Sequence, residues 1–324
     1  MRFAVIGCGA AATRIHIPAL RTAGVDVTVF ASRSRSSAEA ARDLWGGGEV
    51  VGDWAAAVAR DDVDAVVIAT PNGTHRQIAV AALNAGKHVL VDKPMACTSA
   101  DADAMIAAAD AADVVLVPFQ NSRFAPPFVA AHDAVERGAI GGVTGVRAAF
   151  GHGGPQAWSP TATWFLDRVE AGGGCLIDLG VHIVDIVQHV SGHPITRVAA
   201  LTNGTDDTVE TDAQLAVALD GGAIGSIHAS WSSRAGPDHQ LTVIGTDGTL
   251  HLDTRTPLTR VDPSGERARI ELPDTTSNPL AELIAAVAGE RAPSVTAADG
   301  RAAVAVVEAA YHSAATGRAV EVHR

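Results

Sequence analysis

Short apolar runs alternate with longer alanine-rich stretches over the first 118 or so residues of the chain. The apolar runs predict β-strands at residues 2–6, 25–31, 65–69, 88–91 and 114–117. The stretches between them predict helices at residues 10–23, 36–44, 74–85 and 99–112. Because β and α units alternate strictly, the crossovers should be right-handed and the sheet parallel and doubly wound. Pro18 lies inside the first of these helices and is expected to kink or restart it.

The second half of the chain has a different pattern, with several strands in a row and few helices between them. Strands are expected at residues 143–150, 196–202, 212–219, 223–231, 240–245 and 249–253. Helices are expected at residues 127–137, 176–190, 279–288 and 297–315. Asp220-Gly221-Gly222 and Asp247-Gly248 are typical of hairpin turns, which make the neighbouring strands antiparallel. We therefore predict a doubly wound Rossmann domain at 1–120 and an α+β domain at 121–324 with a large, mostly antiparallel open sheet.

Length and composition are consistent with this division. The chain has 324 residues, which is more than one hydrophobic core usually serves. It contains no run of about 18 apolar residues, and its N-terminus passes directly into a strand without a signal-peptide pattern, so we expect a cytoplasmic protein with no membrane partner. A net charge of −12 disfavours nucleic acid, because phosphate binding depends on Lys and Arg. The three cysteines show neither disulfide nor metal-ligand spacing, and no metal is expected.

A glycine-rich loop, Gly7-Cys8-Gly9-Ala10-Ala11-Ala12, follows the first predicted strand and leads into the first helix. The two glycines allow a tight turn and let the backbone approach a pyrophosphate at the helix N-terminus. The small residue at position 12 permits close packing of the helix on the strand. Because the loop joins a strand to a helix within a βαβ pattern, we predict a dinucleotide site. Its residues are Gly7, Cys8, Gly9, Ala10 and Ala11.

The end of the second strand indicates which dinucleotide binds. An acidic residue there would accept hydrogen bonds from the 2′-hydroxyl of NAD, but the chain reads Ala31-Ser32-Arg33-Ser34-Arg35. Ser32 and Arg33 can bind a 2′-phosphate directly, and no acidic residue lies between Phe30 and Ala38. We therefore predict NADP rather than NAD as the cofactor, which makes 1–120 an NADP-binding Rossmann domain. The alternative is that Arg33 is a solvated surface charge.

Three further segments make the interpretation more specific. The first is Thr70-Pro71-Asn72-Gly73-Thr74-His75, the second is residues 85–94 with Asp92-Lys93-Pro94 at its end, and the third is residues 172–185, which begin with three glycines. Together with the glycine loop, they resemble the Gfo/Idh/MocA oxidoreductase family over essentially the whole chain, including the closing residues 311–318. The resemblance implies a Rossmann domain, an NAD(P) cofactor and a small carbohydrate-like substrate.

Lys93 follows a predicted strand, so it stands at the C-terminal edge of the sheet, where doubly wound folds bind ligands. It is one of two lysines, with Lys87, among 24 basic residues, which suggests that its ammonium matters. An ammonium beside the carbinol oxygen would stabilise the alkoxide-like charge that develops as hydride leaves the carbon. By resemblance, Lys93 is the active-site lysine of the family, although Asp92 stands where the family usually has Glu. A surface lysine near a turn is the alternative.

Asp178 and His182 are four residues apart on a predicted helix and Asp185 follows three later, so all three are expected on one face. Histidine is suited to accept a hydroxyl proton near neutral pH, and a nearby carboxylate stabilises its charged form. With the resemblance, we interpret His182 as the general acid/base, Asp178 as a ligand of substrate hydroxyls, and Lys93 as their electrostatic partner. A helix-face salt bridge or a core histidine would give the same spacing. Asp185 is interpreted as structural.

The remaining candidates are expected from the resemblance. Four residues would line the nicotinamide side of the cofactor: Thr70, Pro71, Asn72 and His75. Of these, His75 can also simply begin a helix. Asn121 and Arg123 follow the last Rossmann strand and would hold polar groups of the substrate. The loop before the glycine run is flanked by Trp164, Trp158 and His152, each of which would shape the pocket or serve ordinary packing.

We therefore expect an NADP(H)-dependent oxidoreductase that moves a hydride between nicotinamide and a secondary alcohol, ketone or anomeric carbon of a sugar, inositol or related polyol. A short-chain dehydrogenase is excluded, because the only tyrosine, Tyr311, is followed four residues later by Ala315 instead of lysine. Two alternatives keep the fold: a regulator that binds cofactor without turnover, and a redox-neutral NAD(P)-dependent glycosidase. The domain at 121–324 would serve substrate binding and oligomerisation. Its open sheet has one face to cover, so a homodimer or homotetramer is expected.

Overall fold

The computed structural model describes residues 1–205, 207–233, 238–253, 255–274 and 277–323. The chain forms two compact units, which are described separately. The first contains Met1–Gln120 and Ser277–Arg301, and the second contains Asn121–Thr276 and Ala302–Arg324.

One segment belongs to a different unit from the one expected. The sequence analysis assigned residues 277–301 to the second domain, whereas the structure groups them with the first. Helix α9 (Pro279–Val287) in this segment contacts β5 (His88–Val91) and β6 (Leu116–Pro118). It buries Leu280 and Leu283 completely, and burial of these side chains explains why the chain returns to the first unit.

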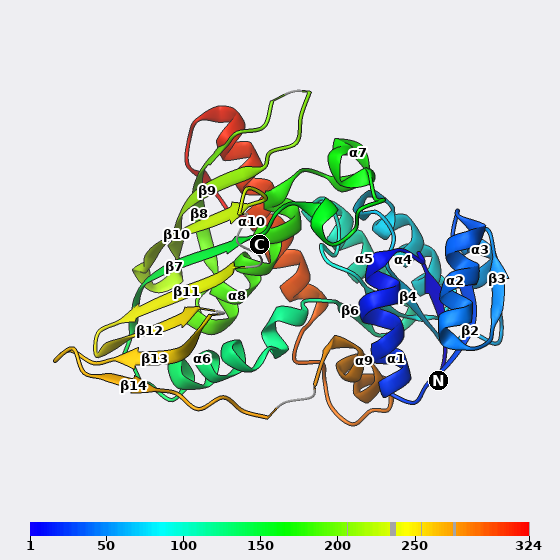
Figure 1. The fold of residues 1–324 in the computed structure, drawn as a ribbon, viewed down its shortest axis with the longest axis horizontal. Coiled ribbons are helices and arrows are strands. Elements are labelled where there is room, and N and C mark those ends of the chain that lie inside the picture. Colours follow the sequence, from blue (N-terminus) through cyan, green and yellow to red (C-terminus); the bar gives the residue numbers. More distant parts are fainter. Residues whose placement is uncertain (206, 234–237, 254, 275–276, 324) are drawn as a thin grey trace. The chain divides into compact units, whose positions relative to one another are not determined.

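The first unit is built on a six-stranded sheet whose neighbouring strands are all parallel. The strands lie in the order β3-β2-β1-β4-β5-β6 (Figure 1). The other bounds are β1 Arg2–Ile6, β2 Asp26–Ala31, β3 Glu49–Val51 and β4 Ala65–Ile68. The predicted parallel, doubly wound sheet is confirmed, and the short β3 was not expected. The strand order reverses between β1 and β4, which is the point where such sheets bind ligands.

Helices connect these strands. Their bounds are α1 Ile17–Thr22, α2 Arg35–Trp45, α3 Trp54–Val58, α4 His75–Asn84 and α5 Ser99–Ala112. A π-helical turn, Ala12–His16, precedes α1. The backbone stays right-handed helical from this turn into α1, since His16 and Ile17 both have αR dihedrals and the N–H of Ile17 donates to the oxygen of Ala12. Pro18 directly follows the wider turn, so the predicted kink or restart takes the form of a π-helical turn within a continuous helix.

The second unit is built on a nine-stranded sheet in the order β14-β13-β12-β11-β7-β10-β9-β8-β15. Among the described strands of this sheet, β7 and β10 are the only parallel neighbours, and the other neighbours are antiparallel. The bounds are β7 Val143–Gly151, β8 Ile195–Thr202, β9 Asp212–Leu219, β10 Ile224–Ser230, β11 Asp238–Gly245, β12 Gly248–Asp253, β13 Thr256–Val261, β14 Arg267–Arg269 and β15 Val320–Glu321. The predicted large, mostly antiparallel sheet is confirmed.

The longer helices of this unit lie on one face of its sheet (Figure 1). They are α6 Pro126–Glu136, α8 Val181–Ser191 and, from Ala302 onward, α10 Ala297–Thr316. The short helix α7, Arg168–Ala171, contacts the helical turn Trp164–Leu166. A π-helical turn, Leu176–Gly180, leads directly into α8. Helix α8 contacts β7, β10 and α6, and nearly all of its residues are buried. Within the part of the chain that the structure describes, we find no helix with the length and apolar character to cross a membrane.

Candidate functional site

The glycine loop after β1 uses its two glycines differently. Gly7 has a φ of +89°, and a Cβ there would collide with the backbone of Ala69. Gly9 faces open space, because a Cβ there would meet no atom within 4 Å. A side chain at Gly9 would occupy the space in front of the helix N-terminus, where backbone N–H groups attract phosphate. The loop therefore fits the pyrophosphate of a dinucleotide.

The other loop residues are small and packed. The N–H of Gly7 donates to the carbonyl oxygen of Ala31 at 2.8 Å, which ties the loop to the end of β2. Cys8 is buried with its Sγ 3.6 Å from the same oxygen, and burial raises the pKa of its thiol to about 12. Ala10 and Ala11 are partly buried at the start of the helix. Cys8 therefore contributes packing and has no ionised thiol near neutral pH.

Ser32 and Arg33 follow β2 directly, at the edge of the sheet that also holds the glycine loop. Ser32 is partly buried, and its Oγ accepts a hydrogen bond from the N–H of Ser34 at 3.3 Å. Arg33 is exposed, while Arg35 pairs with Glu39 at 2.9 Å on the surface of α2. The end of β2 thus presents a hydroxyl and a guanidinium and no carboxylate.

His75 ties together two of the segments found in the sequence. It is completely buried, with Nδ1 at 2.9 Å from the carbonyl oxygen of Pro94 and Nε2 at 2.9 Å from that of Thr70. Burial lowers the pKa of His75. Because both ring nitrogens face backbone carbonyls, a direct contact of this ring with a cofactor would require one of these contacts to break. Asn72 is also buried, and Pro71 lies partly exposed beside it.

Lys93 lies just beyond the end of β5, and Asp92 fixes its backbone. One carboxylate oxygen of Asp92 accepts the N–H of Lys93 at 2.7 Å, and the other lies 3.3 Å from Nε2 of His16. Burial acts to raise the pKa of Asp92, but the hydrogen bond with His16 and the charges of His16 and Lys93 together lower it to about 2. Asp92 is therefore ionised at neutral pH and orders the backbone at Lys93.

In the second unit, Asp178 lies in the π-helical turn before α8 and is buried. Its Oδ2 accepts a hydrogen bond from Nε1 of Trp231 at 3.0 Å and lies 3.9 Å from Nε2 of His152. Nδ1 of His152 accepts the N–H of Gly154 at 3.0 Å, so the neutral ring carries its proton on Nε2, toward Asp178. Trp231 was not among the residues expected in the site, whereas His152 was expected either to shape the pocket or to serve ordinary packing.

His182 is one turn further along the same helical segment. Its Nδ1 lies 3.2 Å from Oγ of Ser122, in the short helical turn Asn121–Phe124, and its ring meets the edge of Phe150. Ser122 was also missed by the sequence analysis. Its position, 60 residues before His182, gives no local signal in the sequence.

The remaining predicted residues of the second unit lie in different surroundings. Arg123 forms a buried ion pair with Asp185, with N–O distances of 2.8 and 2.6 Å. Asn121 is exposed, and Trp164 is partly exposed and stacks on Phe165 at a centroid distance of 3.8 Å. The guanidinium of Arg123 therefore neutralises the buried charge of Asp185.

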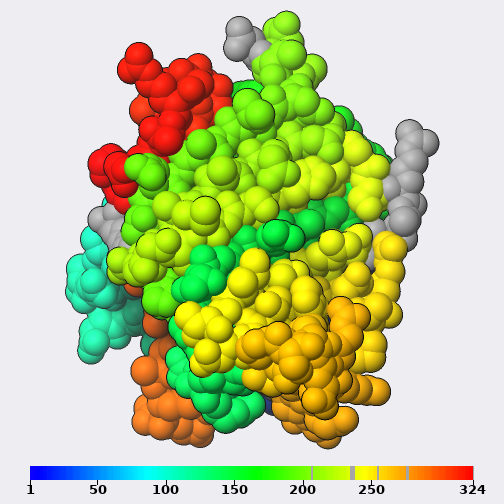
Figure 2. All heavy atoms as spheres, turned by 90° about the vertical axis from the view of Figure 1, so that its left-hand side faces the viewer, coloured from blue at the N-terminus to red at the C-terminus, as the bar shows by residue number. Residues whose placement is uncertain are grey.

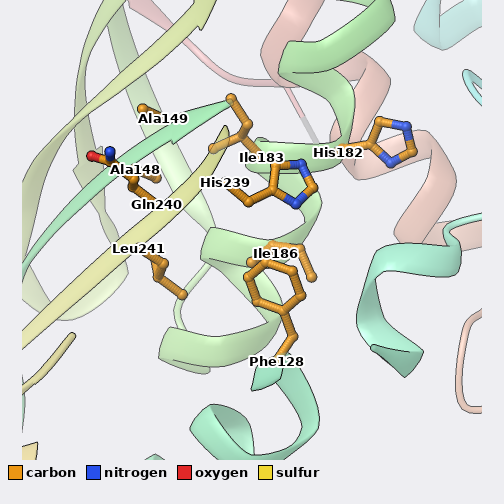
Figure 3. A pocket seen from close by; sticks show the side chains of 9 residues that line it. All are labelled: Phe128, Ala148, Ala149, His182, Ile183, Ile186, His239, Gln240 and Leu241. Atoms are coloured by element: carbon orange, nitrogen blue, oxygen red, sulfur yellow. The ribbon is translucent and has the colours of Figure 1, made fainter. Parts of the chain in front are cut away.

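A small pocket of about 10 Å³, the space of roughly one water molecule, lies between α6, α8 and the sheet of the second unit. Figure 3 shows the ring of His239 next to Phe128 and Ile186, while the ring of His182 points away from them. Burial lowers the pKa of His239 to about 4, so it is neutral at pH 7. His182 also lines this pocket, which therefore lies beside the candidate site. Within the described ranges, no group of three His, Cys, Asp or Glu side chains could hold a metal ion.

Comparisons with known proteins cover both units. Residues 1–119 match the family model described as "Oxidoreductase family, NAD-binding Rossmann fold", and residues 128–251 match "GFO/IDH/MocA C-terminal domain". The chain is 31% identical to 1,5-anhydro-D-fructose reductase of Ensifer adhaerens, over 99% of this chain and 98% of that protein. It is 28% identical to D-xylose 1-dehydrogenase (NADP(+)) 2 of Haloferax volcanii, over 99% and 100%.

A solved structure extends the similarity to three dimensions. GenD2 from gentamicin A biosynthesis, in complex with NAD, has a TM-score of 0.86 and 32% identity to this chain. The alignment covers 100% of this chain and 97% of GenD2. The similarity to these proteins therefore extends over the full length of both units.

Proposed function

The chain belongs to the Gfo/Idh/MocA family of oxidoreductases, and from this premise we propose that it catalyses NADP(H)-dependent oxidation or reduction of a sugar, inositol or related polyol. At the coarser level it is an NAD(P)-dependent oxidoreductase that acts on CH–OH groups. The observation that carries the proposal is the presence of two sets of polar side chains. One surrounds Lys93 at the end of β5, and the other surrounds Asp178 and His182.

The glycine loop and the end of β2 would hold the cofactor. Gly7, Gly9 and the backbone between them suit the pyrophosphate, and Ser32 with Arg33 suits a 2′-phosphate. The relatives give no single preference, since one carries NADP(+) in its name and GenD2 was solved with NAD. Our preference for NADP therefore rests on the residues after β2. When bound, the cofactor supplies or accepts the hydride at its nicotinamide ring.

We assign the transfer of the substrate's hydroxyl proton to His182. Because Oγ of Ser122 lies at Nδ1, the transfer is assigned to Nε2, which takes the hydroxyl proton as hydride leaves the substrate carbon and returns it in the reverse direction. Asp178, held by Trp231, would bind a substrate hydroxyl. Lys93 would stabilise negative charge on the reacting oxygen. Asn121 and Trp164 remain proposals for substrate binding, as does Arg123 beyond its pairing with Asp185.

We also propose a homodimer or homotetramer. Figure 2 looks onto the face of the nine-stranded sheet that is opposite to its helices. Two large apolar side chains on it are strongly exposed, Leu201 on β8 at 76% and Ile224 on β10 at 68%. Covering such residues with a second copy would remove apolar surface from water. Light scattering should show a dimer or tetramer, and a monomer at micromolar concentration would contradict the proposal.

The proposed reaction is tested by the near-ultraviolet absorbance of reduced nicotinamide. The purified protein is given NADP or NAD and a panel of inositols, aldoses and related polyols, and the reverse reaction is followed with the corresponding ketones. We expect turnover with NADP to exceed that with NAD. Turnover with NAD alone would contradict the NADP assignment. Tightly bound cofactor that is released on denaturation, without net turnover, would favour a redox-neutral glycosidase or a regulator.

A further inference from the structure

The helical segment that carries Asp178 and His182 begins at a run of glycines whose backbone is held by Glu210. Oε1 of Glu210 accepts hydrogen bonds from the N–H of Gly174 at 3.0 Å and of Leu176 at 2.9 Å. The backbone oxygen of Glu210 accepts the N–H of Cys175 at 2.9 Å. The first N–H groups of a helix have no partner within the helix. Glu210, 34 residues beyond Leu176, therefore caps this helix from another part of the chain.

Tyr311 holds the same carboxylate. Its hydroxyl donates to Oε1 of Glu210 at 2.7 Å, and it is the only tyrosine of the chain. Burial, followed by the negative charge of Glu210, raises the pKa of Tyr311 well above its ordinary value, so its hydroxyl remains a donor. Helix α10 is thereby linked through Glu210 to the helical segment of Asp178.

The glycines are required for this arrangement. A Cβ on Gly173 would collide with the hydroxyl of Tyr311, and a Cβ on Gly174 would collide with the backbone oxygen of Glu210. Gly172 has a φ of +83° and ends α7. The three consecutive glycines are therefore explained by the left-handed turn at Gly172 and by the close approach of other atoms at Gly173 and Gly174. Together they fix the backbone in place.

The cap is close to the candidate catalytic side chains. Asp178 lies two residues after Leu176, and its N–H donates to the oxygen of Gly174 at 3.1 Å. Glu210 is only 1% exposed, so its hydrogen bonds act in a medium of low dielectric constant and are strong. Its negative charge also lies at a helix N-terminus, where it is favourable. A shift at Leu176 would move Asp178 relative to Trp231.

We propose that Glu210 and Tyr311 are positioning residues, which fix the start of this helical segment and thereby set the places of Asp178 and His182 for reaction. Neither residue is assigned a contact with substrate. The inference rests on the proposed function, because that function assigns the reaction to Asp178 and His182.

The test compares Tyr311→Phe with Ser313→Ala, a matched control on the same helix. Tyr311→Phe removes the hydroxyl that bonds Glu210, whereas Ser313→Ala removes a buried hydroxyl that bonds Ala200 N at 2.9 Å and Arg318 O at 2.6 Å. Both variants lose buried hydrogen bonds and should lower Tm by comparable amounts. We expect kcat to fall about tenfold in Tyr311→Phe and less than about twofold in Ser313→Ala, because small displacements of catalytic groups are costly. The Kd of NADP should be unchanged in both.

A second readout needs no turnover. Nε1 of Trp231 donates to Asp178 at 3.0 Å, so the indole resonance of Trp231 in a proton–nitrogen correlation spectrum reports the place of Asp178. The resonance is assigned by its loss in Trp231→Phe. We expect it to shift in Tyr311→Phe and in Glu210→Gln, which removes the charge of the cap, and to stay in place in Ser313→Ala.

An unshifted Trp231 resonance in both cap variants, with kinetics equal to those of Ser313→Ala, would overturn the inference and leave Glu210 and Tyr311 with a purely structural role. Failure of the proposed function would look different. In that case the wild-type protein shows no NAD(P)-linked turnover with any polyol, and the Trp231 resonance still decides whether the cap positions Asp178.

Discussion

The surroundings of Lys93 and those of His182 are held in different ways. Lys93 follows a strand of a parallel sheet, and Asp92 and His75 fix the backbone around it through contacts with main-chain atoms. Asp178 and His182 instead depend on side chains from distant segments, Trp231 and Ser122, which lie 53 and 60 residues away. The first arrangement follows from the geometry of a Rossmann sheet. The second depends on a buried network of side-chain hydrogen bonds, in which each partner matters.

The comparison implies that the two sets can be disrupted separately. His182→Asn should lower kcat by about a thousandfold, because general acid/base catalysis contributes that order of rate. The Kd of NADP should not change, since His182 lies outside the unit that contains the glycine loop. The control is Ser122→Ala, which removes only the hydroxyl at Nδ1 and should cost about tenfold or less. A kcat for His182→Asn that remains close to that of Ser122→Ala would contradict the assignment of the proton to His182.

Arg123→Met should destabilise the second unit strongly. It leaves the carboxylate of Asp185 buried without the guanidinium that now pairs with it, at a cost of about 3–5 kcal/mol in the free energy of unfolding. The exposed pair of Arg137 and Asp133, 3.8 Å apart, provides the control, and Arg137→Met should cost less than about 1 kcal/mol. Urea denaturation measures both. If Arg123→Met instead kept the stability of the wild-type protein and lost substrate binding, the main role of Arg123 would be to bind substrate. That is the role expected from the resemblance.

Asp92, next to Lys93, should affect the free energy of unfolding mainly at acidic pH. The pKa of Asp92 is lowered from 3.8 to about 2 in the folded protein, so its stabilising effect is complete above the unfolded value and is lost as pH falls from about 4 to about 2. The wild-type protein should therefore lose about 2 kcal/mol more than Asp92→Asn over this range. Unfolding free energies at several pH values, subtracted between the two proteins, measure the difference. Parallel curves would show that Asp92 is not held ionised by His16 and Lys93.

The smallest expected effect concerns the 2′-phosphate. Arg33→Ala should weaken NADP binding about tenfold, the loss of one charge-assisted contact, and leave NAD binding unchanged. Arg35→Ala is the control, because Arg35 already pairs with Glu39. Fluorescence titration with both cofactors measures the change. Equal effects of Arg33→Ala on NADP and NAD would mean that Arg33 does not select the phosphate.

The sequence predicted the features that depend on local spacing. The alternation of strands and helices, the loop at Gly7 and the position of Lys93 after a strand can all be seen in contiguous residues. The partners of the second set could not be seen in this way. Ser122, Trp231 and Glu210 belong to short turns or strand ends, and only the folded sheet brings them to the helix of Asp178 and His182.

Parts of the fold itself were also not predicted. The return of residues 277–301 to the first unit was missed because an amphipathic helix does not indicate which sheet will cover it. The strands β13 and β14 were missed because they are short, largely exposed, and rich in Arg, Thr and Pro. Strand β13 pairs with β12 and β14 pairs with β13, so their formation depends on the neighbouring strand in the sheet.

The most direct test of the proposed reaction is the comparison of Lys93→Met with Lys87→Met, the chain's other lysine, whose Nζ donates to the backbone oxygen of Arg60 at 2.8 Å. With an active polyol and NADP, kcat/KM should fall by about a hundredfold to a thousandfold in Lys93→Met, because a charge at the reacting oxygen stabilises the transition state. The Kd of NADP should stay the same, and Lys87→Met should retain wild-type turnover. Equal activity of the two variants would contradict a role of Lys93 in the reaction, and with it the mechanism proposed for this enzyme.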